Sequence, residues 1–108
     1  MKIKKLEEAK NYIKKFNFNN PLKESEVKMI FKSALSEYFN KILDLSLLTA
    51  ICIELLYFKN NIGEFEDRKL QQYLLMGDKL AYLITLNTDS NEIEEIIKNF
   101  KEYLSNSF

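Results

Sequence analysis

The residues of this sequence that could carry chemistry are few, and histidine is not among them. The chain has 108 residues, with no histidine, one cysteine (Cys52) and two glycines. The lack of histidine excludes the usual general base, the commonest metal ligand and every Ser-His or Cys-His nucleophile arrangement. Two isolated glycines cannot build a phosphate-cradling loop or a dinucleotide-binding fingerprint. We therefore predict no catalytic residue, no cofactor and no metal, and a protein that is not an enzyme on its own.

One acidic cluster, EFED from Glu64 to Asp67, is the remaining candidate for metal chemistry. Glu64 and Asp67 are three residues apart, so on a helix they would share a face and could hold Mg²⁺ with substrate phosphates. Acids at the start of a helix also complement its dipole, and we favour this second interpretation. It predicts that the fourth helix begins at Glu64 or Phe65. Asp78 is interpreted in the same way, as a solvated surface acid and not a catalyst.

The stretch from Leu47 to Phe58, LLTAICIELLYF, is apolar on nearly every side and contains a single Glu54. A bilayer span needs about 20 apolar residues, whereas residues 45–58 would reach only about 21 Å as a helix. We predict no membrane span and a central helix packed on several sides, with Cys52 as a small core hydrophobe. Glu54 is expected to reach water at the rim or to pair with a lysine; the alternative is a functional carboxylate in a cleft.

Few turn-forming residues and an ordinary apolar content indicate the fold class. Two glycines and one proline disfavour a sheet with many hairpins, and 46% hydrophobic with 30% charged residues is typical of a globular protein. We predict an all-α fold, in which residues 1–108 form a single domain, a compact bundle of four to five helices.

The spacing of apolar residues places these helices. We predict them over residues 2–16, 21–40, 45–59, 64–86 and 91–104. Asn20-Pro21 is expected to start the second helix, as N-cap and first helical residue, and Asp44 or Ser46 to cap the third. Only Asn40-Lys41 offers a break between the second and third helices, so one long bent helix over 22–59 stays open.

The fourth predicted helix carries two apolar stripes. The expected core stripe consists of Leu70, Tyr73, Leu74, Gly77, Ala81 and Ile84. Gly77 costs this helix about 1 kcal/mol relative to alanine, which a close approach by a neighbouring helix would explain. The second stripe, separated from the first by Gln71, Asp78 and Thr85, consists of Leu75, Tyr82 and Leu86. A surplus apolar stripe is typical of a partner-binding or self-association surface; the alternative is that the first or last helix folds over it.

Charge is balanced overall but not along the chain. Sixteen basic and sixteen acidic residues cancel, while lysines dominate residues 1–41 and acids dominate residues 42–108. This pattern supports a rival hypothesis, a nucleic-acid-associated helical subunit like those that line the backbone channel of CRISPR effector complexes. The residues that would contact phosphates are Lys4, Lys5, Lys14, Lys15, Lys28 and Lys32. The near absence of arginine and the zero net charge argue against it. A third hypothesis is a small immunity or antitoxin-like protein that inhibits one specific partner.

Two segments resemble the middle of trans-prenyl diphosphate synthases: IELLYF at 53–58 and RKLQQYLLMGDKLAYLITL at 68–86. Leu75, Gly77 and Asp78 stand where that family has a Leu-x-Gly-Asp-like signature. The likeness covers about residues 47–100 and is greatest to the non-catalytic small subunit of bacterial two-component hexaprenyl and heptaprenyl synthases. Where the family has an Asp-Asp-x-x-Asp metal motif, this chain reads FKNNIGEF. The resemblance therefore implies an accessory subunit that binds a catalytic partner through its helices.

These observations predict a non-catalytic helical protein that acts by protein–protein contact, as an accessory or regulatory subunit or as a homodimer. Leu75, Tyr82 and Leu86 are the predicted partner-binding residues. The unpaired Cys52 fits a reducing compartment, and the N-terminal residues lack the uninterrupted apolar region of a secretory signal. We therefore expect a cytoplasmic protein.

Overall fold

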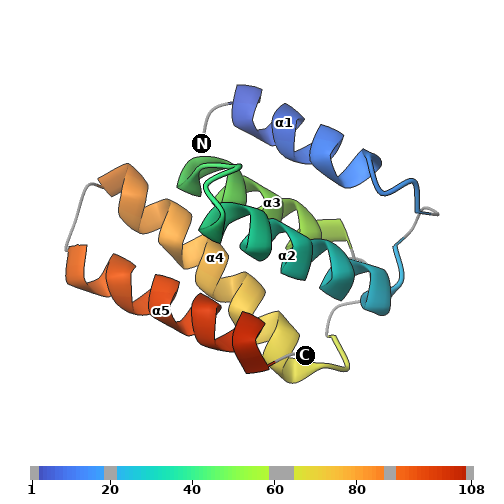
Figure 1. Cartoon of the computed structure of the whole chain (residues 1–108). Coiled ribbons are helices and arrows are strands. Elements are labelled where there is room, and N and C mark those ends of the chain that lie inside the picture. Colours follow the sequence, from blue (N-terminus) through green and yellow to red (C-terminus); the bar gives the residue numbers. More distant parts are fainter. Residues whose placement is uncertain (1–2, 19–21, 59–64, 87–89, 107–108) are drawn as a thin grey trace.

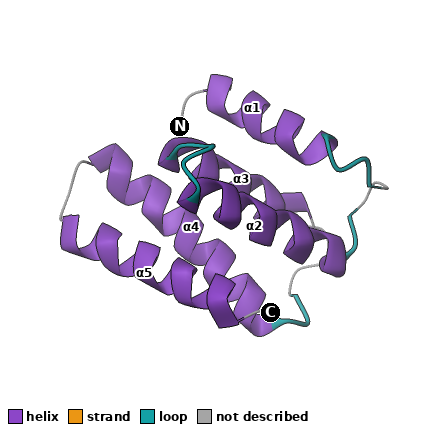
Figure 2. Cartoon of the chain, in the orientation of Figure 1, coloured by secondary structure: helices purple, strands orange, loops and turns teal. Residues whose placement is uncertain are grey.

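Helices account for all the regular structure in the part of the chain that the computed structural model describes, residues 3–18, 22–58, 65–86 and 90–106. These helices are α1 (Ile3–Lys14), α2 (Glu24–Phe39), α3 (Leu45–Phe58), α4 (Arg68–Leu86) and α5 (Ser90–Asn106) (Figures 1 and 2). The predicted all-α fold of four to five helices is confirmed. The Cα radius of gyration is 13.0 Å, the value expected for a compact domain of this length, about 13 Å.

Four of the helices form a closed ring, and the fifth lies outside it. α2 packs on α3, α3 on α4, α4 on α5, and α5 returns to α2, while α1 packs against α3 from outside the ring (Figure 1). α3 therefore has neighbours in α1, α2 and α4. This explains why its sequence is apolar on nearly every side, as predicted for a central helix. No helix in the described ranges is long and apolar enough to cross a membrane.

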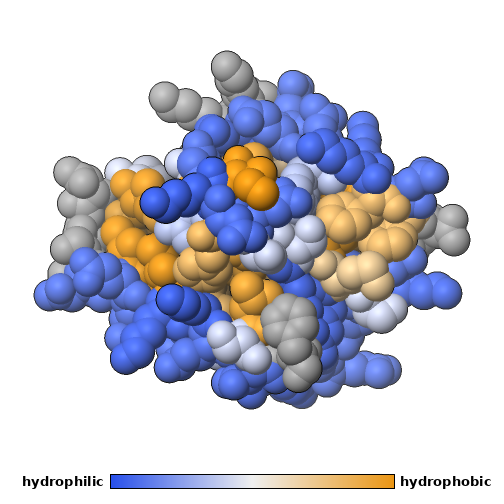
Figure 3. Space-filling model, in the orientation of Figure 1, coloured by the Kyte–Doolittle hydropathy of each residue, from blue (hydrophilic) through white to orange (hydrophobic). Residues whose placement is uncertain are grey.

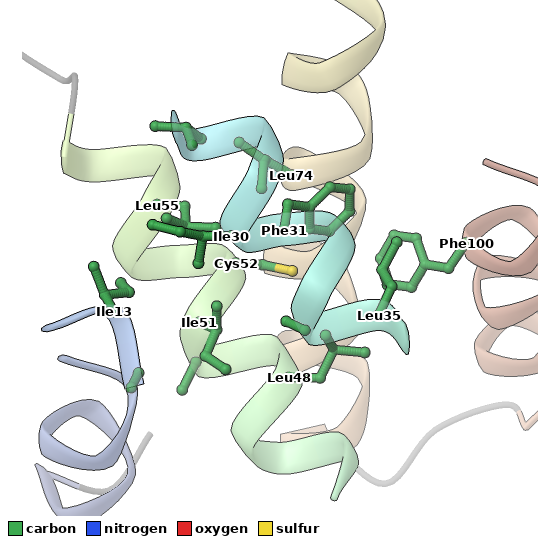
Figure 4. Close-up of a cluster of buried hydrophobic side chains, with 14 of the residues drawn as sticks. Ile13, Ile30, Phe31, Leu35, Leu48, Ile51, Cys52, Leu55, Leu74 and Phe100 are labelled. Carbon is green, nitrogen blue, oxygen red and sulfur yellow. The ribbon is translucent and has the colours of Figure 1, made fainter. Parts of the chain in front are cut away.

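The core is built where the ring helices and α1 meet. Side chains from every helix converge there, among them Ile13, Ile30, Phe31, Leu35, Leu48, Ile51, Leu55, Leu74 and Phe100 (Figure 4). The rings of Phe31 in α2 and Phe100 in α5 meet edge to face at 5.8 Å, which closes the ring of helices. Each such side chain contributes about 1.5–3 kcal/mol when it is fully buried.

α3 and α4 approach each other closely where Cys52 faces Gly77. A Cβ atom placed on Gly77 would lie 2.5 Å from Cβ of Cys52 and 2.6 Å from its Sγ, with Phe100 Cζ at 3.9 Å. No side chain fits in that space without a shift of the helices. The close approach predicted to explain Gly77 is therefore confirmed.

The segment 22–59 contains two helices, because α2 ends in a left-handed residue. Lys41 has φ 64°, and its N–H donates to the Tyr38 carbonyl at 3.0 Å, while the N–H of Ile42 donates to the Glu37 carbonyl at 2.8 Å. This pair of bonds is a Schellman motif, here with lysine in the position that glycine usually holds. It turns the chain sharply enough for α3 to pack back on α2.

Two predicted helix starts are wrong. α2 begins at Glu24 and not at Pro21, because Glu26 Oε1 accepts the N–H of Lys23 at 2.8 Å and so caps the helix there; Asn20 and Pro21 lie outside the described residues. α4 begins at Arg68 and not at Glu64 or Phe65. Phe65 is instead 2% exposed, as a core residue ahead of the helix.

Gly77→Ala is expected to destabilise the fold by about 1–2 kcal/mol, because contacts this short belong at the upper end of the cost of overpacking, about 2–3 kcal/mol, and the better helix former returns about 1 kcal/mol. In a Cys52→Gly background the same substitution should stabilise, since the clashing Cβ and Sγ atoms are gone. Urea unfolding followed by circular dichroism measures both effects. A G77A protein as stable as the wild type would contradict the close helix contact.

Candidate interaction surface

Three large apolar side chains of α4 lie exposed on one side of the helix. Leu75 is 47% exposed, Tyr82 63% and Leu86 49%. Their spacings of seven and four residues put them in one row, together with Lys79. We call Leu75, Lys79, Tyr82 and Leu86 the outer ridge.

The outer ridge points away from the ring because neighbours occupy the other sides of α4. Gly77, opposite the ridge, faces α3. On one flank, Asp78 lies close enough to Cys52 of α3 to act on its ionisation. On the other flank, the ring of Tyr73 lies 4.5 Å from the ring of Tyr103 in α5. From the ridge itself, Lys79 Nζ reaches Glu92 Oε1 of α5 at 2.8 Å. α1 packs on α3, so neither the first nor the last helix folds over the ridge.

The inward side of α4 differs in part from the predicted core stripe. The buried residues of α4 are Leu70, Leu74, Gly77, Leu80 and Leu83. Tyr73, Ala81 and Ile84, predicted as core, are only partly buried. The predicted stripe is centred on the side that faces α3, whereas the buried side of α4 extends further round the helix to Leu80 and Leu83. α4 also packs on α5, where the ring of Tyr73 lies 4.5 Å from that of Tyr103. The apolar spacing of Met76, Leu80 and Leu83 was the signal for this wider buried side.

The acidic cluster before α4 serves to start the helix. Asp67 Oδ1 accepts the N–H of Leu70 at 3.1 Å, so Asp67 is the N-cap of α4. That hydrogen bond, and then Lys28 Nζ at 3.3 Å, hold the pKa of Asp67 below its usual value. Glu64, the other half of the pair considered for Mg²⁺, lies outside the described residues.

A carboxylate from α2 completes this helix start. The carboxylate of Glu24 accepts the N–H of Asp67 at 2.7 Å and that of Glu66 at 2.9 Å. The carboxylates of Glu24 and Asp67 thus accept hydrogen bonds from backbone N–H groups, and that of Asp67 also pairs with Lys28. Within the described ranges, no group of three or more His, Cys, Asp or Glu residues is placed to hold a metal ion.

The remaining candidates for chemistry lie on α3 and α4. Cys52 is 0% exposed, and burial, reinforced by the negative charge of Asp78, raises the pKa of its thiol far above the ordinary value. A thiol of this kind is a core hydrophobe and not a nucleophile, as predicted. Asp78 is partly buried, so its description as a solvated surface acid is only partly right. Glu54 keeps some exposure, as expected for a carboxylate at the rim.

Two lysines of the nucleic-acid hypothesis pair with the capping acid of another helix. Lys5 of α1 lies 3.4 Å from Asp44, whose Oδ1 caps α3 by accepting the N–H of Leu47 at 2.8 Å. Lys28 of α2 pairs in the same way with Asp67, the cap of α4. The ammonium of Lys15 lies 5.6 Å from the ring centre of Tyr12; the side chain of Lys4 lies outside the described part of the chain.

Sequence reasoning missed a hollow at the α2–α3 turn. Its volume is about 700 Å³, and it is lined by Tyr38, Phe39, Lys41, Ile42, Leu43, Asp44 and Leu45. Ile42 is 69% exposed there. The available signal was the break at Asn40-Lys41, which leaves an apolar residue outside both helices. Met29 of α2, 54% exposed, was also missed.

On the face that Figure 3 shows, hydrophobic surface is broken up by charge. In the view of Figure 3, hydrophobic side chains gather in separate patches between hydrophilic ones, one of them at the left where α4 and α5 adjoin. Single apolar residues on a surface are ordinary. The outer ridge differs because three of the five exposed large hydrophobic residues of the described chain stand in one row on one helix.

Comparison with known proteins gives no relative: no protein-family model, no curated protein and no solved structure matches this chain. The three residues that carry the resemblance to prenyl synthases have different surroundings. Leu75 is exposed, Gly77 is buried against Cys52, and Asp78 is partly buried. Of the segment FKNNIGEF, residues 59–64 lie outside the described ranges.

Asp67→Ala is expected to lower the free energy of unfolding at pH 7 by about 1 kcal/mol, the usual worth of an N-cap. Asp67→Asn, which can still cap, should lose less. Because the folded pKa of Asp67 is depressed, its ionic contribution is present above its unfolded pKa, about 3.9, and is lost as pH falls through the folded value.

Urea unfolding between pH 2.5 and 7 checks this. The advantage of the wild type over Asp67→Asn should shrink steadily as the pH falls below about 3.9. Glu66→Ala, at the exposed neighbouring acid, is the matched control and should stay within about 0.5 kcal/mol of the wild type. A constant gap between wild type and Asp67→Asn across this range would contradict an ionic role for Asp67.

Proposed function

We propose that the protein is a non-catalytic helical protein of the cytoplasm that acts through protein–protein contact, as an accessory or regulatory subunit or as a homodimer. The outer ridge is the surface through which it is bound. One observation carries the proposal: Leu75, Tyr82 and Leu86 are about half exposed or more, in a single row on a helix whose other sides are packed against α3 and α5.

The ridge has the chemistry of a helix-binding surface. Apolar anchors at positions i, i+7 and i+11 are the pattern by which a helix lies along a partner helix or in a groove. Tyr82 stands between two leucines along the ridge, and tyrosine is among the side chains that contribute most to interfaces. Lys79 can cover apolar surface with its stem while its ammonium stays in water.

Folding alone does not account for the ridge. The side chains that stabilise α4 are those that face the ring, among them Leu70, Leu74 and Leu80, each 0% exposed. Replacing an exposed side chain of the ridge should therefore change stability little. The likeness of residues 53–58 and 68–86 to the small subunit of prenyl diphosphate synthases implies the same accessory role.

Site-specific photo-crosslinking in the native host tests the proposal. A photoreactive phenylalanine analogue placed at Leu75, Tyr82 or Leu86 should give a discrete protein adduct. The same analogue at Lys101, an exposed position on α5, should not. Adducts of equal yield from Lys101, or none from the three ridge positions, would contradict the proposal.

Leu75→Glu serves as the interface variant in the same cells. It is expected to reduce the adduct formed from position 82 at least tenfold, because it places a charge in the contact. Its free energy of unfolding should stay within about 0.5 kcal/mol of the wild type, as for an exposed site. Loss of the adduct together with loss of the fold would instead assign Leu75 to the core.

A further inference from the structure

A pocket lies where the end of α1 meets α2. Its volume is about 230 Å³, and it is lined by Tyr12, Lys15, Phe16, Ser33 and Glu37. The Tyr12 hydroxyl lies 3.1 Å from Ser33 Oγ, which ties the two helices together at the pocket. The rings of Tyr12 and Phe16 meet edge to face at 5.6 Å. The pocket thus combines two hydroxyl groups with two aromatic rings that hold one another in place.

Two opposite charges border the same tyrosine in this pocket. The ammonium of Lys15 lies 5.6 Å from the centre of the Tyr12 ring. Burial raises the pKa of the Tyr12 hydroxyl, and the nearby carboxylate of Glu37 raises it further, against the hydrogen bond with Ser33. Among the described residues, neither Lys15 nor Glu37 takes part in an ion pair. The pocket therefore presents one cation and one anion to a ligand.

A ligand with charges of both signs fits this pocket better than a ligand with one charge. A simple amine would meet the ammonium of Lys15, and a simple carboxylate would meet the carboxylate of Glu37. Like charges in close contact oppose binding. We infer that the pocket binds a small zwitterion of the amino-acid type, whose carboxylate pairs with Lys15 and whose ammonium pairs with Glu37.

The size and the remaining surface of the pocket limit this ligand. Sites for drug-sized molecules measure about 300–1,000 Å³, so a volume of about 230 Å³ suits a molecule as small as a free amino acid. The Ser33 hydroxyl keeps hydrogen-bonding capacity beyond its contact with Tyr12, and the ring of Phe16 can pack on an apolar side chain. Because Lys15 is exposed and Glu37 only partly buried, the two ion pairs are weak. We therefore expect a Kd on the order of 1 mM.

NMR titration of the isotope-labelled protein tests this inference. The standard amino acids are added one at a time to about 20 mM, well above the expected Kd. At least one of them is expected to shift the backbone amides of Tyr12, Ser33 and Glu37 in a saturable way. The amides of Leu75 and Tyr82 should not move, because this pocket is separate from the outer ridge and does not rest on the proposed function.

Derivatives of the amino acid that binds most tightly distinguish a zwitterion site from a site for one charge. Its N-acetyl derivative lacks the ammonium, and its carboxamide lacks the carboxylate. Each is expected to bind about fivefold more weakly, or less, because one of the two ion pairs is lost. A carboxamide that binds as tightly would make the pocket a cation site, and an N-acetyl derivative that binds as tightly would make it an anion site. Either result would overturn the inference.

Two substitutions in the pocket test the same pairs from the side of the protein. Lys15→Gln and Glu37→Gln are each expected to weaken binding about fivefold. Lys14→Gln, at the exposed lysine next to Lys15, and Glu94→Gln, at an exposed acid of α5, are the matched controls and should leave the affinity unchanged. Circular dichroism of each variant confirms that the helices are retained. The absence of a saturable shift with any amino acid, or an unchanged affinity in either pocket variant, would also overturn the inference.

Discussion

The contact between α3 and α4 at Cys52 and Gly77 fixes the arrangement on which the rest of the structure depends. Because Gly77 has no side chain, the two helices meet backbone to side chain, with Cys52 filling the space that a Cβ atom would take. This contact sets the rotation of α4 about its own axis. Once Gly77 faces α3, the helical repeat directs Leu75, Tyr82 and Leu86 away from the ring of helices. The exposure of the outer ridge is thus a consequence of how the core packs.

The charged residues that the sequence offers as candidates for metal or phosphate binding serve mainly to position helices. Asp44 and Asp67 each cap a helix and each pair with a lysine from another helix, Lys5 and Lys28. Glu24 adds a carboxylate from α2 to the start of α4. These contacts tie α1 to α3 and α2 to α4 at the ends of the helices, where backbone donors would otherwise lack partners. Three of the five exposed large hydrophobic residues of the described chain, by contrast, lie on the outer ridge.

Much of this fold could be predicted from the sequence, and the failures have physical causes. Helical spacing identified the five helices, the central position of α3 and the reason for Gly77, since these depend on the local pattern of apolar residues. The predicted start of α2 lies three residues early, because the Asn-Pro pair is typical of a helix start, whereas Glu26 provides the cap at Lys23. Leu80 and Leu83 were missed because a single helix cannot disclose which two neighbours it will have. The exposure of the ridge is predictable because the sequence shows more apolar residues on this helix than one core side can bury. The identity of any partner is not predictable, because a partner's residues are not in this sequence.

The central claim is that the outer ridge is covered when the protein works. Hydroxyl-radical footprinting of the protein in its native cells and after purification tests it most directly, with Met29 of α2, 54% exposed, as the internal reference. The account predicts that oxidation of Tyr82 and Leu75, relative to that of Met29, is strongly reduced in cells and recovers in the purified protein. Equal relative oxidation of Tyr82 in the two states would contradict it.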